Sequence, residues 1–145
     1  MDILTVEQRR KNMSNIPSKG TKPEKLVRSL LHRLGYRFKL HSQKLPGTPD
    51  IILPKFKAVI FIHGCFWHRH EGCKYTTNPA TNAEKWQKKF QANKDRDIRN
   101  TQILEESGWL PIVIWECETR HSDVITLKLD NLLRQRLIEI EYARD

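Results

Sequence analysis

The sequence predicts a single α/β domain in which a central sheet is flanked by helices, and three observations support this prediction. Short apolar runs of strand length alternate with longer amphipathic segments of helical spacing, the pattern of a layered α/β fold. A chain of 145 residues can bury one core. Apolar residues make up 38% and charged residues 30%, a balance typical of folded proteins.

The chain begins with a polar, basic segment that we expect to form an N-terminal arm. This arm covers residues 1–20 and ends in a loose Pro-Ser-Lys-Gly sequence, and residues 21–145 are expected to form one domain. No apolar stretch approaches the roughly 20 residues of a membrane span, and no secretory signal opens the chain. We therefore expect a cytoplasmic protein that does not bind a membrane.

The first predicted element of the domain is an amphipathic helix. Thr21 can cap it, Pro23 suits its first turn, and Glu24 stands where a capping box has its acid. Apolar side chains then recur at helical spacing until Gly35, which ends the helix.

Four strands are predicted, over residues 36–40, 50–53, 58–62 and 110–115. The third and fourth are continuous apolar runs, typical of strands that are covered on both faces. We expect Pro111 to keep the start of the fourth strand out of the sheet interior, because proline cannot donate to a neighbouring strand. Two helices complete the sandwich. One runs from Thr81, with Glu84 three residues on, to about Gly108, and the other covers residues 122–142.

The charge is strongly positive. Lysine and arginine number 26 against 17 acidic residues, which gives a net charge of +9 and an isoelectric point near 9.7. Such a field attracts polyanions, of which nucleic acid is the commonest. The helix predicted after Thr81 carries much of this charge, on Lys85, Lys88, Lys89, Lys94, Arg96 and Arg99. A solvated basic face without such a partner is the alternative.

The three cysteines predict a metal site. Cys65, His70 and Cys73 lie in an irregular stretch after the third predicted strand, and Cys117 follows the fourth. If these strands are neighbours, the side chains can meet, and three thiolates with one imidazole form the closed set of structural zinc. An odd cysteine count without a secretory signal also favours a metal over disulfides. Ordinary buried cysteines beside a surface histidine are the alternative.

A second group predicts catalysis. Asp50 opens an apolar strand, where its carboxylate can hold a hard cation such as Mg²⁺. His63 and His68 follow the next strand, and imidazoles can move protons near neutral pH. A turn carboxylate that caps its strand is the alternative for Asp50. Glu24 can supply a further acid, or it can serve only the capping box.

Several motifs resemble the very-short-patch-repair (Vsr) mismatch endonucleases of bacteria. The two strongest are Phe61-Ile62-His63-Gly64-Cys65-Phe66-Trp67-His68 and Leu45-Pro46-Gly47-Thr48-Pro49-Asp50. Further matches are Arg10-Lys11-Asn12-Met13, Pro79-Ala80-Thr81 with Trp86, Gly108-Trp109 and Val113-Ile114-Trp115-Glu116-Cys117. The resemblance covers about residues 8–120.

The resemblance implies a mixed sheet like that of type II restriction endonucleases, and strand-specific, Mg²⁺-dependent nicking 5′ of the T in a T:G mismatch. It implies that Asp50 and the backbone carbonyl of Ile62 bind Mg²⁺ and that His68 acts on the attacking water, supported by His63 and Glu24. The structural zinc ligands it implies are Cys65, His70, Cys73 and Cys117. The sequence departs from the family in two places. Ile62 replaces a threonine, and the zinc loop is one residue longer, so that His68 remains an alternative zinc ligand to His70.

The same resemblance suggests how duplex DNA with a mismatch is bound. We expect Phe66, Trp67 and Trp86 to enter the base stack, because a wobble pair is easier to wedge open than a Watson–Crick pair. The resemblance adds Lys89 and Asn93 at the mismatch and Met13 in the flanking groove. Trp109 and Trp115, beside apolar strand residues, are expected in the core.

Three functions follow as hypotheses. The first is a nicking enzyme that repairs deaminated 5-methylcytosine, with mismatch-repair proteins as possible partners. The second is a nuclease of the same fold with another DNA target, and the third is a non-catalytic, zinc-stabilised DNA-binding module. Cutting one strand requires no partner subunit, so a monomer is expected.

Overall fold

A computed structural model describes residues 20–144 of the chain. Its centre is a mixed sheet in the order β1-β2-β3-β4. The strands are β1 (Lys39–Leu40), β2 (Ile51–Leu53), β3 (Ala58–His63) and β4 (Leu110–Trp115). The first two pairings are antiparallel, whereas β3 and β4 run parallel, with His63 opposite Trp115. The predicted α/β class and the adjacency of the third and fourth strands are confirmed.

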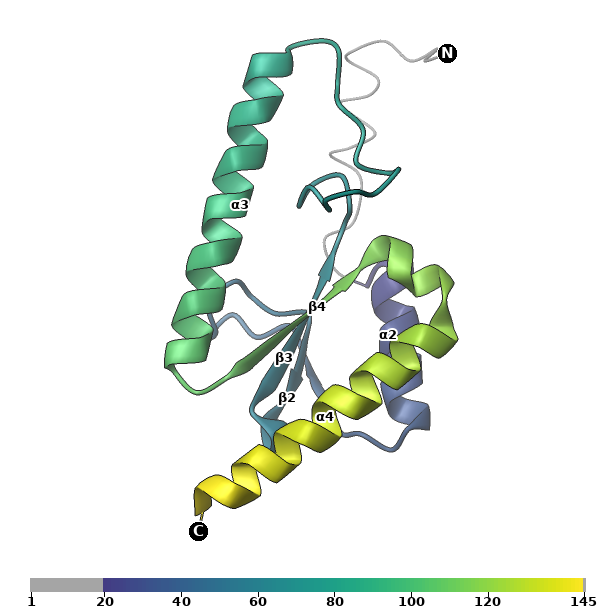
Figure 1. The fold of residues 1–145 in the computed structure, drawn as a ribbon, viewed down its shortest axis with the longest axis vertical. Coiled ribbons are helices and arrows are strands. Elements are labelled where there is room, and N and C mark those ends of the chain that lie inside the picture. Colours follow the sequence, from purple (N-terminus) through teal and green to yellow (C-terminus); the bar gives the residue numbers. More distant parts are fainter. Residues whose placement is uncertain (1–19, 145) are drawn as a thin grey trace.

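Helices cover both faces of this sheet (Figure 1). They are α2 (Lys22–Arg33), α3 (Ala83–Glu106) and α4 (Ser122–Arg144), and short 3-10 helices cover Pro54–Phe56 (η1) and Glu116–Arg120 (η2). Helix α3 lies on one side of the sheet, and α2 and α4 lie on the other (Figure 1). No helix in residues 20–144 is long and apolar enough to cross a membrane.

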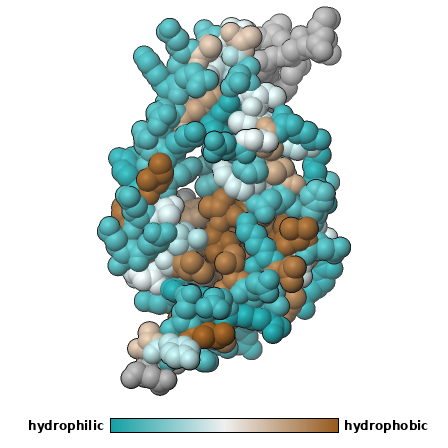
Figure 2. Space-filling model, viewed as in Figure 1, coloured by the Kyte–Doolittle hydropathy of each residue, from teal (hydrophilic) through white to brown (hydrophobic). Residues whose placement is uncertain are grey.

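The alternation of side chains along the strands divides the core into two clusters. Ile51 and Ile60 face α2 and α4, where they join a cluster that includes Leu129. Ile52 and Val59 face α3 and pack with Phe61 and Leu104. Both faces of β2 and β3 are therefore buried, as the continuous apolar runs predict. Figure 2 shows apolar side chains gathered over the middle of the face between α3 and α4, inside a hydrophilic rim.

Two predicted boundaries are corrected. Only Lys39–Leu40 of residues 36–40 pairs as a strand, and Tyr36 and Phe38 before it pack against the larger core cluster. Helix α3 begins at Ala83 rather than Thr81, after Asn82 in a left-handed conformation (φ 57°) that departs from the predicted cap. Pro111 lies within β4, and within the described sheet β4 has only β3 as a neighbour, so the proline occupies an edge strand as expected.

Candidate active site and metal centre

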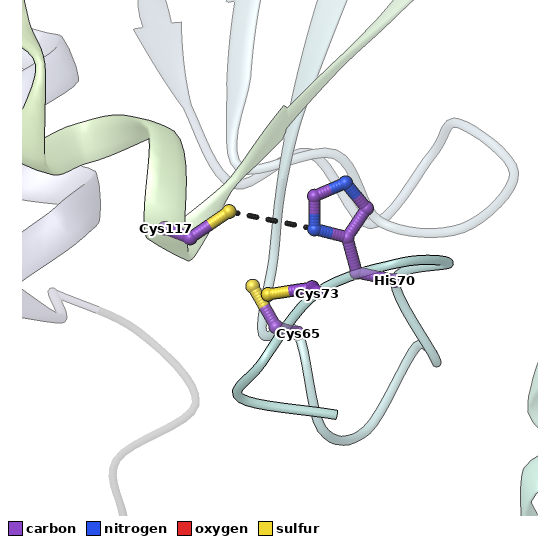
Figure 3. Close-up of side chains that lie close together, drawn as sticks. All are labelled: Cys65, His70, Cys73 and Cys117. Atoms are coloured by element: carbon purple, nitrogen blue, oxygen red, sulfur yellow. Dashed lines mark hydrogen bonds between the residues drawn. The ribbon is translucent and has the colours of Figure 1, made fainter. Parts of the chain in front are cut away.

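The carboxyl ends of β3 and β4 meet at one edge of the sheet because the two strands are parallel. The irregular segment that holds Cys65, His70 and Cys73 leaves from the end of β3, and η2 with Cys117 leaves from the end of β4. Donor atoms of these side chains lie within 4.8 Å of one another. Figure 3 shows them pointing toward a common centre, with Sγ of Cys117 3.4 Å from Nδ1 of His70. The predicted convergence is confirmed, and the group could hold a metal ion.

The donor chemistry fits a soft cation such as zinc, which prefers thiolate and imidazole ligands. Burial raises the pKa of Cys65 to about 12, so this thiol would stay protonated without a compensating positive charge. The ring of His70 stacks on Trp115 at 4.2 Å, which orients its Nδ1 toward Cys117. Trp115 is thus half-buried against His70 of the candidate metal site, and its predicted place in the core is wrong. Trp109 is also half-buried and packs against the smaller core cluster.

Hydrogen bonds hold the turn that carries Cys117. The N–H of Trp115 donates to Glu118 Oε1 at 3.0 Å, and Lys128 Nζ on α4 lies 3.2 Å from Glu118 Oε2. The same ammonium group donates to the carbonyl of Val113 at 3.2 Å. These bonds connect β4, η2 and α4, so the position of Cys117 is fixed by three elements.

The loop between β3 and α3 is organised by its own polar contacts. The Thr76 hydroxyl donates to the carbonyl of His70 at 2.7 Å, and Arg69 donates to the Thr77 carbonyl at 2.8 Å. The Arg69 guanidinium also lies 4.1 Å from the centre of the Phe90 ring on α3. A metal ion and these contacts would together hold a segment that has no regular secondary structure.

Asp50 lies at the start of β2, where its side chain continues the sheet pairing. Its N–H donates to the carbonyl of Ile60 at 3.1 Å, and its Oδ2 accepts from the Ile62 N–H at 2.7 Å. Burial raises the pKa of Asp50 to about 6, and the nearby charge of Glu24 acts in the same direction, against the Ile62 N–H. A partly buried carboxylate of this kind would be stabilised in its charged form by a cation.

Glu24 lies beside Asp50, on the first turn of α2, and is 1% exposed. Its N–H donates to Thr21 Oγ1 at 3.3 Å, which confirms Thr21 as the helix cap. Its carboxylate accepts from the Gly20 N–H at 2.9 Å and lies 2.6 Å from His41 Nε2. Oxygen and nitrogen donors of Glu24, His41 and Asp50 lie within 4.8 Å of one another, so this second group could also hold a cation.

His63 and His68 form a third group together with Asp97 on α3. The two imidazole rings stack at 3.8 Å, almost parallel. Nδ1 of His68 lies 2.7 Å from Asp97 Oδ2, an arrangement that fixes the ring and leaves Nε2 for another partner. Burial, and then the charge of His68, lower the pKa of His63 to about 4, so His63 is neutral at pH 7. His70, not His68, lies among the cysteines, which removes the alternative left open by the sequence.

Both candidate catalytic groups have a contact with the end of β3. Ile62 bonds the carboxylate of Asp50 through its N–H, and the next residue, His63, stacks on His68. The residue that bonds Asp50 and the first histidine of the stacked pair are therefore adjacent in β3. The role of the Ile62 carbonyl as a ligand stays a prediction.

Aromatic side chains gather where the loop between β3 and α3 contacts α3. Phe66 and Trp67 from the loop pack against Trp86 of α3 at centroid distances of 5.7 Å each. Lys89 Nζ lies 5.6 Å from the Trp67 and Trp86 rings, and Asn93 Nδ2 donates to the Trp67 carbonyl at 3.4 Å. The three aromatic residues are half-buried, and Lys89 is exposed. Five of the predicted DNA-binding residues therefore lie together, while Met13 lies outside the described residues.

Sequence reasoning missed His41 and Asp97. Asp97 is one acid on a helix rich in charged residues, and no local pattern distinguishes it. His41 had a usable signal, because the pairing of β1 with β2 places it opposite Asp50. Reading that register from the sequence would have required the strand at residues 36–40 to be placed correctly.

Comparison with known proteins supports a common ancestry over almost the whole chain. A family model described as DNA mismatch endonuclease Vsr matches residues 1–74. The type II nicking enzyme V.XorIIP of Xanthomonas oryzae is 46% identical over 132 residues, which cover 91% of this chain and 96% of that protein. The type II nicking enzyme V.NmeAIP of Neisseria meningitidis is 42% identical and covers 92% and 95%. The DNA mismatch endonuclease Vsr of Escherichia coli is 39% identical and covers 95% and 86%.

Proposed function

The chain belongs to the Vsr family of DNA mismatch endonucleases, and from this premise we propose that it nicks duplex DNA 5′ of the T in T:G mismatches. Such a mismatch arises when 5-methylcytosine deaminates opposite guanine, so the nick would start a repair event. The chain is a DNA endonuclease; the mismatch preference, the strand that is cut and the dependence on Mg²⁺ are the proposal.

In this proposal Asp50 and the backbone carbonyl of Ile62 hold the Mg²⁺ ion. The carboxylate of Asp50 is already held against the Ile62 N–H at 2.7 Å, so its free oxygen has a restricted direction. Glu24 adds a second buried carboxylate on the same side. Bound Mg²⁺ would polarise the phosphate, acidify a water and stabilise the leaving oxygen. Oxygen ligands and a site of negative charge suit this hard cation.

His68 would take the proton from the attacking water. Asp97 accepts a hydrogen bond from Nδ1 of His68, which leaves the lone pair of Nε2 as the base. The carboxylate also stabilises the imidazolium that forms when the proton has moved. His63 remains neutral beside it and can donate a hydrogen bond to a phosphate oxygen without adding a competing charge.

The cysteine group would hold a structural zinc ion. Its side chains supply three sulfurs and one nitrogen, so a tetrahedral ion has no open position for substrate. Phe66, Trp67 and His68 lie between two of the ligands, Cys65 and His70. Zinc binding would therefore position His68, the proposed base, together with Phe66 and Trp67.

The aromatic wedge of Phe66, Trp67 and Trp86 would test how easily a base step opens. Inserting a ring between bases requires a few kcal/mol of unstacking, and a mismatched step requires less. Lys89 lies over Trp67 and Trp86, where its ammonium group can contact a base edge or a phosphate. Asn93 is tied to the Trp67 carbonyl and has a second amide N–H available.

One observation carries this proposal. The carboxylate of Asp50 accepts from the N–H of Ile62, and the next residue of β3, His63, stacks on His68. The test is a nicking assay with end-labelled duplexes that contain T:G, C:G or an unpaired T, with and without Mg²⁺. We expect one cut, 5′ of the mismatched T, only with Mg²⁺, and no cut by Asp50→Ala.

The alternatives give different results in the same assay. Equal cutting of fully paired DNA would indicate a nuclease with another target. Tight binding without cutting by the unchanged chain would indicate a DNA-binding module. Either result would refute the proposed function.

A further inference from the structure

His41 is a polar residue at a position that the pairing of the sheet fixes. Its N–H donates to the carbonyl of Asp50 at 3.1 Å, which extends the antiparallel ladder of β1 and β2 by one step. Residues that stand opposite each other in such a ladder carry their side chains on the same face. His41 also has a positive φ of 47°, a backbone conformation that is uncommon for residues other than glycine and that clusters at functional sites.

The ring of His41 points at the buried carboxylate next to Asp50. Its Nε2 lies 2.6 Å from Glu24 Oε1, and its side chain is 21% exposed, whereas that of Glu24 is 2% exposed. The other oxygen of Glu24, Oε2, accepts from the Gly20 N–H at 2.9 Å and from Arg28 Nη1 at 3.3 Å. Each oxygen of Glu24 is thus held, and His41 is the described side chain that holds Oε1.

We propose that His41 is a positioning residue of the cation site: its Nε2–H fixes the Glu24 carboxylate beside Asp50 and so sets the affinity of the site for a divalent cation. This inference rests on the proposed function only in taking Asp50 as the cation ligand. It adds a side chain that acts through Glu24 rather than by touching the cation.

Direct coordination of the cation by His41 fits the geometry less well. A nitrogen 2.6 Å from a carboxylate oxygen shares a proton with it, so the Nε2 lone pair is not free for a cation. A hard cation also prefers oxygen ligands, which Glu24 and Asp50 supply. Partners that orient a ligand in this way commonly change metal affinity by about tenfold or more when they are removed.

Binding of Mn²⁺ alone to the zinc-loaded full chain, followed by the electron paramagnetic resonance signal of free Mn²⁺, tests the proposal without DNA. The key variant is His41→Asn, because asparagine tolerates the positive φ but its amide is too short to reach Glu24. We expect its Mn²⁺ dissociation constant to rise about tenfold. His41→Gln, whose longer amide can donate to the same oxygen, should stay within about threefold of the unchanged chain. Equal binding by His41→Asn and the unchanged chain would overturn the proposal.

A double variant shows whether His41 acts through Glu24. In a Glu24→Gln background, His41→Asn should weaken Mn²⁺ binding by less than about twofold further, because coupled residues are not additive. A full additional tenfold loss would show an independent role and overturn the proposal. His32→Gln, at an exposed histidine on α2, is the matched control and should bind as the unchanged chain does. Thermal unfolding confirms that each variant is folded, and Asp50→Asn identifies the signal of this site.

Failure of this inference can be told apart from failure of the proposed function. If the unchanged chain nicks T:G duplexes but His41→Asn binds Mn²⁺ normally, only the positioning role is refuted. If His41→Asn weakens Mn²⁺ binding but the unchanged chain cuts no mismatch, the positioning role stands and the proposed function does not.

Discussion

Replacing Asp50 with asparagine should stabilise the fold at neutral pH while it abolishes nicking. Burial and the charge of Glu24 raise the pKa of Asp50 from its ordinary 3.8 to about 6. A carboxyl group with a raised pKa favours folding in its protonated form, so its effect depends on pH. Well below pH 3.8 the group is protonated in the folded and the unfolded chain, and it carries no penalty. As the pH rises to about 6 the unfolded chain ionises first, and the free energy of unfolding falls.

The size of this penalty follows from the difference in pKa. A tenfold change in an equilibrium constant is about 1.4 kcal/mol, so the rise from 3.8 to about 6 corresponds to roughly 3 kcal/mol. Asp50 is only partly buried, and solvent screening reduces this figure to about 2 kcal/mol. Asparagine has no charge to desolvate and can still accept from the Ile62 N–H. Asp50→Asn should therefore be about 2 kcal/mol more stable at pH 8 without divalent cations other than zinc.

Urea unfolding of both chains at pH 8 and near pH 4 measures this effect. The fold favours the neutral form of His63, so the contribution of His63 to stability is lost as the pH falls from 6.5 toward 4. Because both chains share this loss, the difference between their free energies of unfolding reports the effect of Asp50 alone. The stability difference should shrink toward zero near pH 4, and added Mg²⁺ should stabilise only the unchanged chain. A variant that is less stable at pH 8, or a difference that does not change with pH, would refute the reasoning.

Three further predictions concern the other groups. Asp97→Asn should lower the nicking rate about a hundredfold or more and leave mismatch binding within about twofold, because His68 loses the partner that fixes its ring. Single-turnover kinetics measure the nicking rate, and an unchanged rate would contradict the prediction. Cys117→Ser should lower the zinc content measured by atomic absorption and reduce the free energy of unfolding, because zinc binding contributes to folding, whereas full zinc content would argue against the ligand set. Lys89→Ala should weaken T:G binding and lower the slope of log affinity against log salt by about one if Lys89 contacts a phosphate, and an unchanged slope would place it at a base instead.

The sheet and the cysteine group were predictable from the sequence because their signals are local. Continuous apolar runs predicted β3 and β4, and a cysteine follows each strand. Only one spatial assumption was needed, that these strands are neighbours, and the parallel pairing of His63 with Trp115 confirms it. Three cysteines, with His70 or His68 as the fourth ligand, then leave few ways to form a closed site.

The partners of the catalytic residues were not predictable in the same way. The Asp97 carboxylate reaches His68 across 29 positions of sequence, from a helix whose orientation depends on its packing against β4. His41 contacts Glu24 only because β1 pairs with β2 and α2 packs beside them, and β1 is too short to produce a strand pattern. The core position predicted for Trp115 was wrong for a related reason, since the alternation in β4 does not reveal that its ring stacks on His70 from a distant loop.

The proposed reaction requires one pocket that joins a cation at Asp50 to the imidazole of His68. Nuclear magnetic resonance of histidine-labelled, zinc-loaded protein with substoichiometric Mn²⁺ tests this directly, because a paramagnetic ion broadens only the signals near it. The ring signals of His63, His68 and His41 should broaden, those of the exposed His32 and His121 should remain sharp, and Asp50→Asn should restore all of them. Sharp His68 signals while Mn²⁺ occupies the Asp50 site would show that the two groups do not act on one phosphodiester.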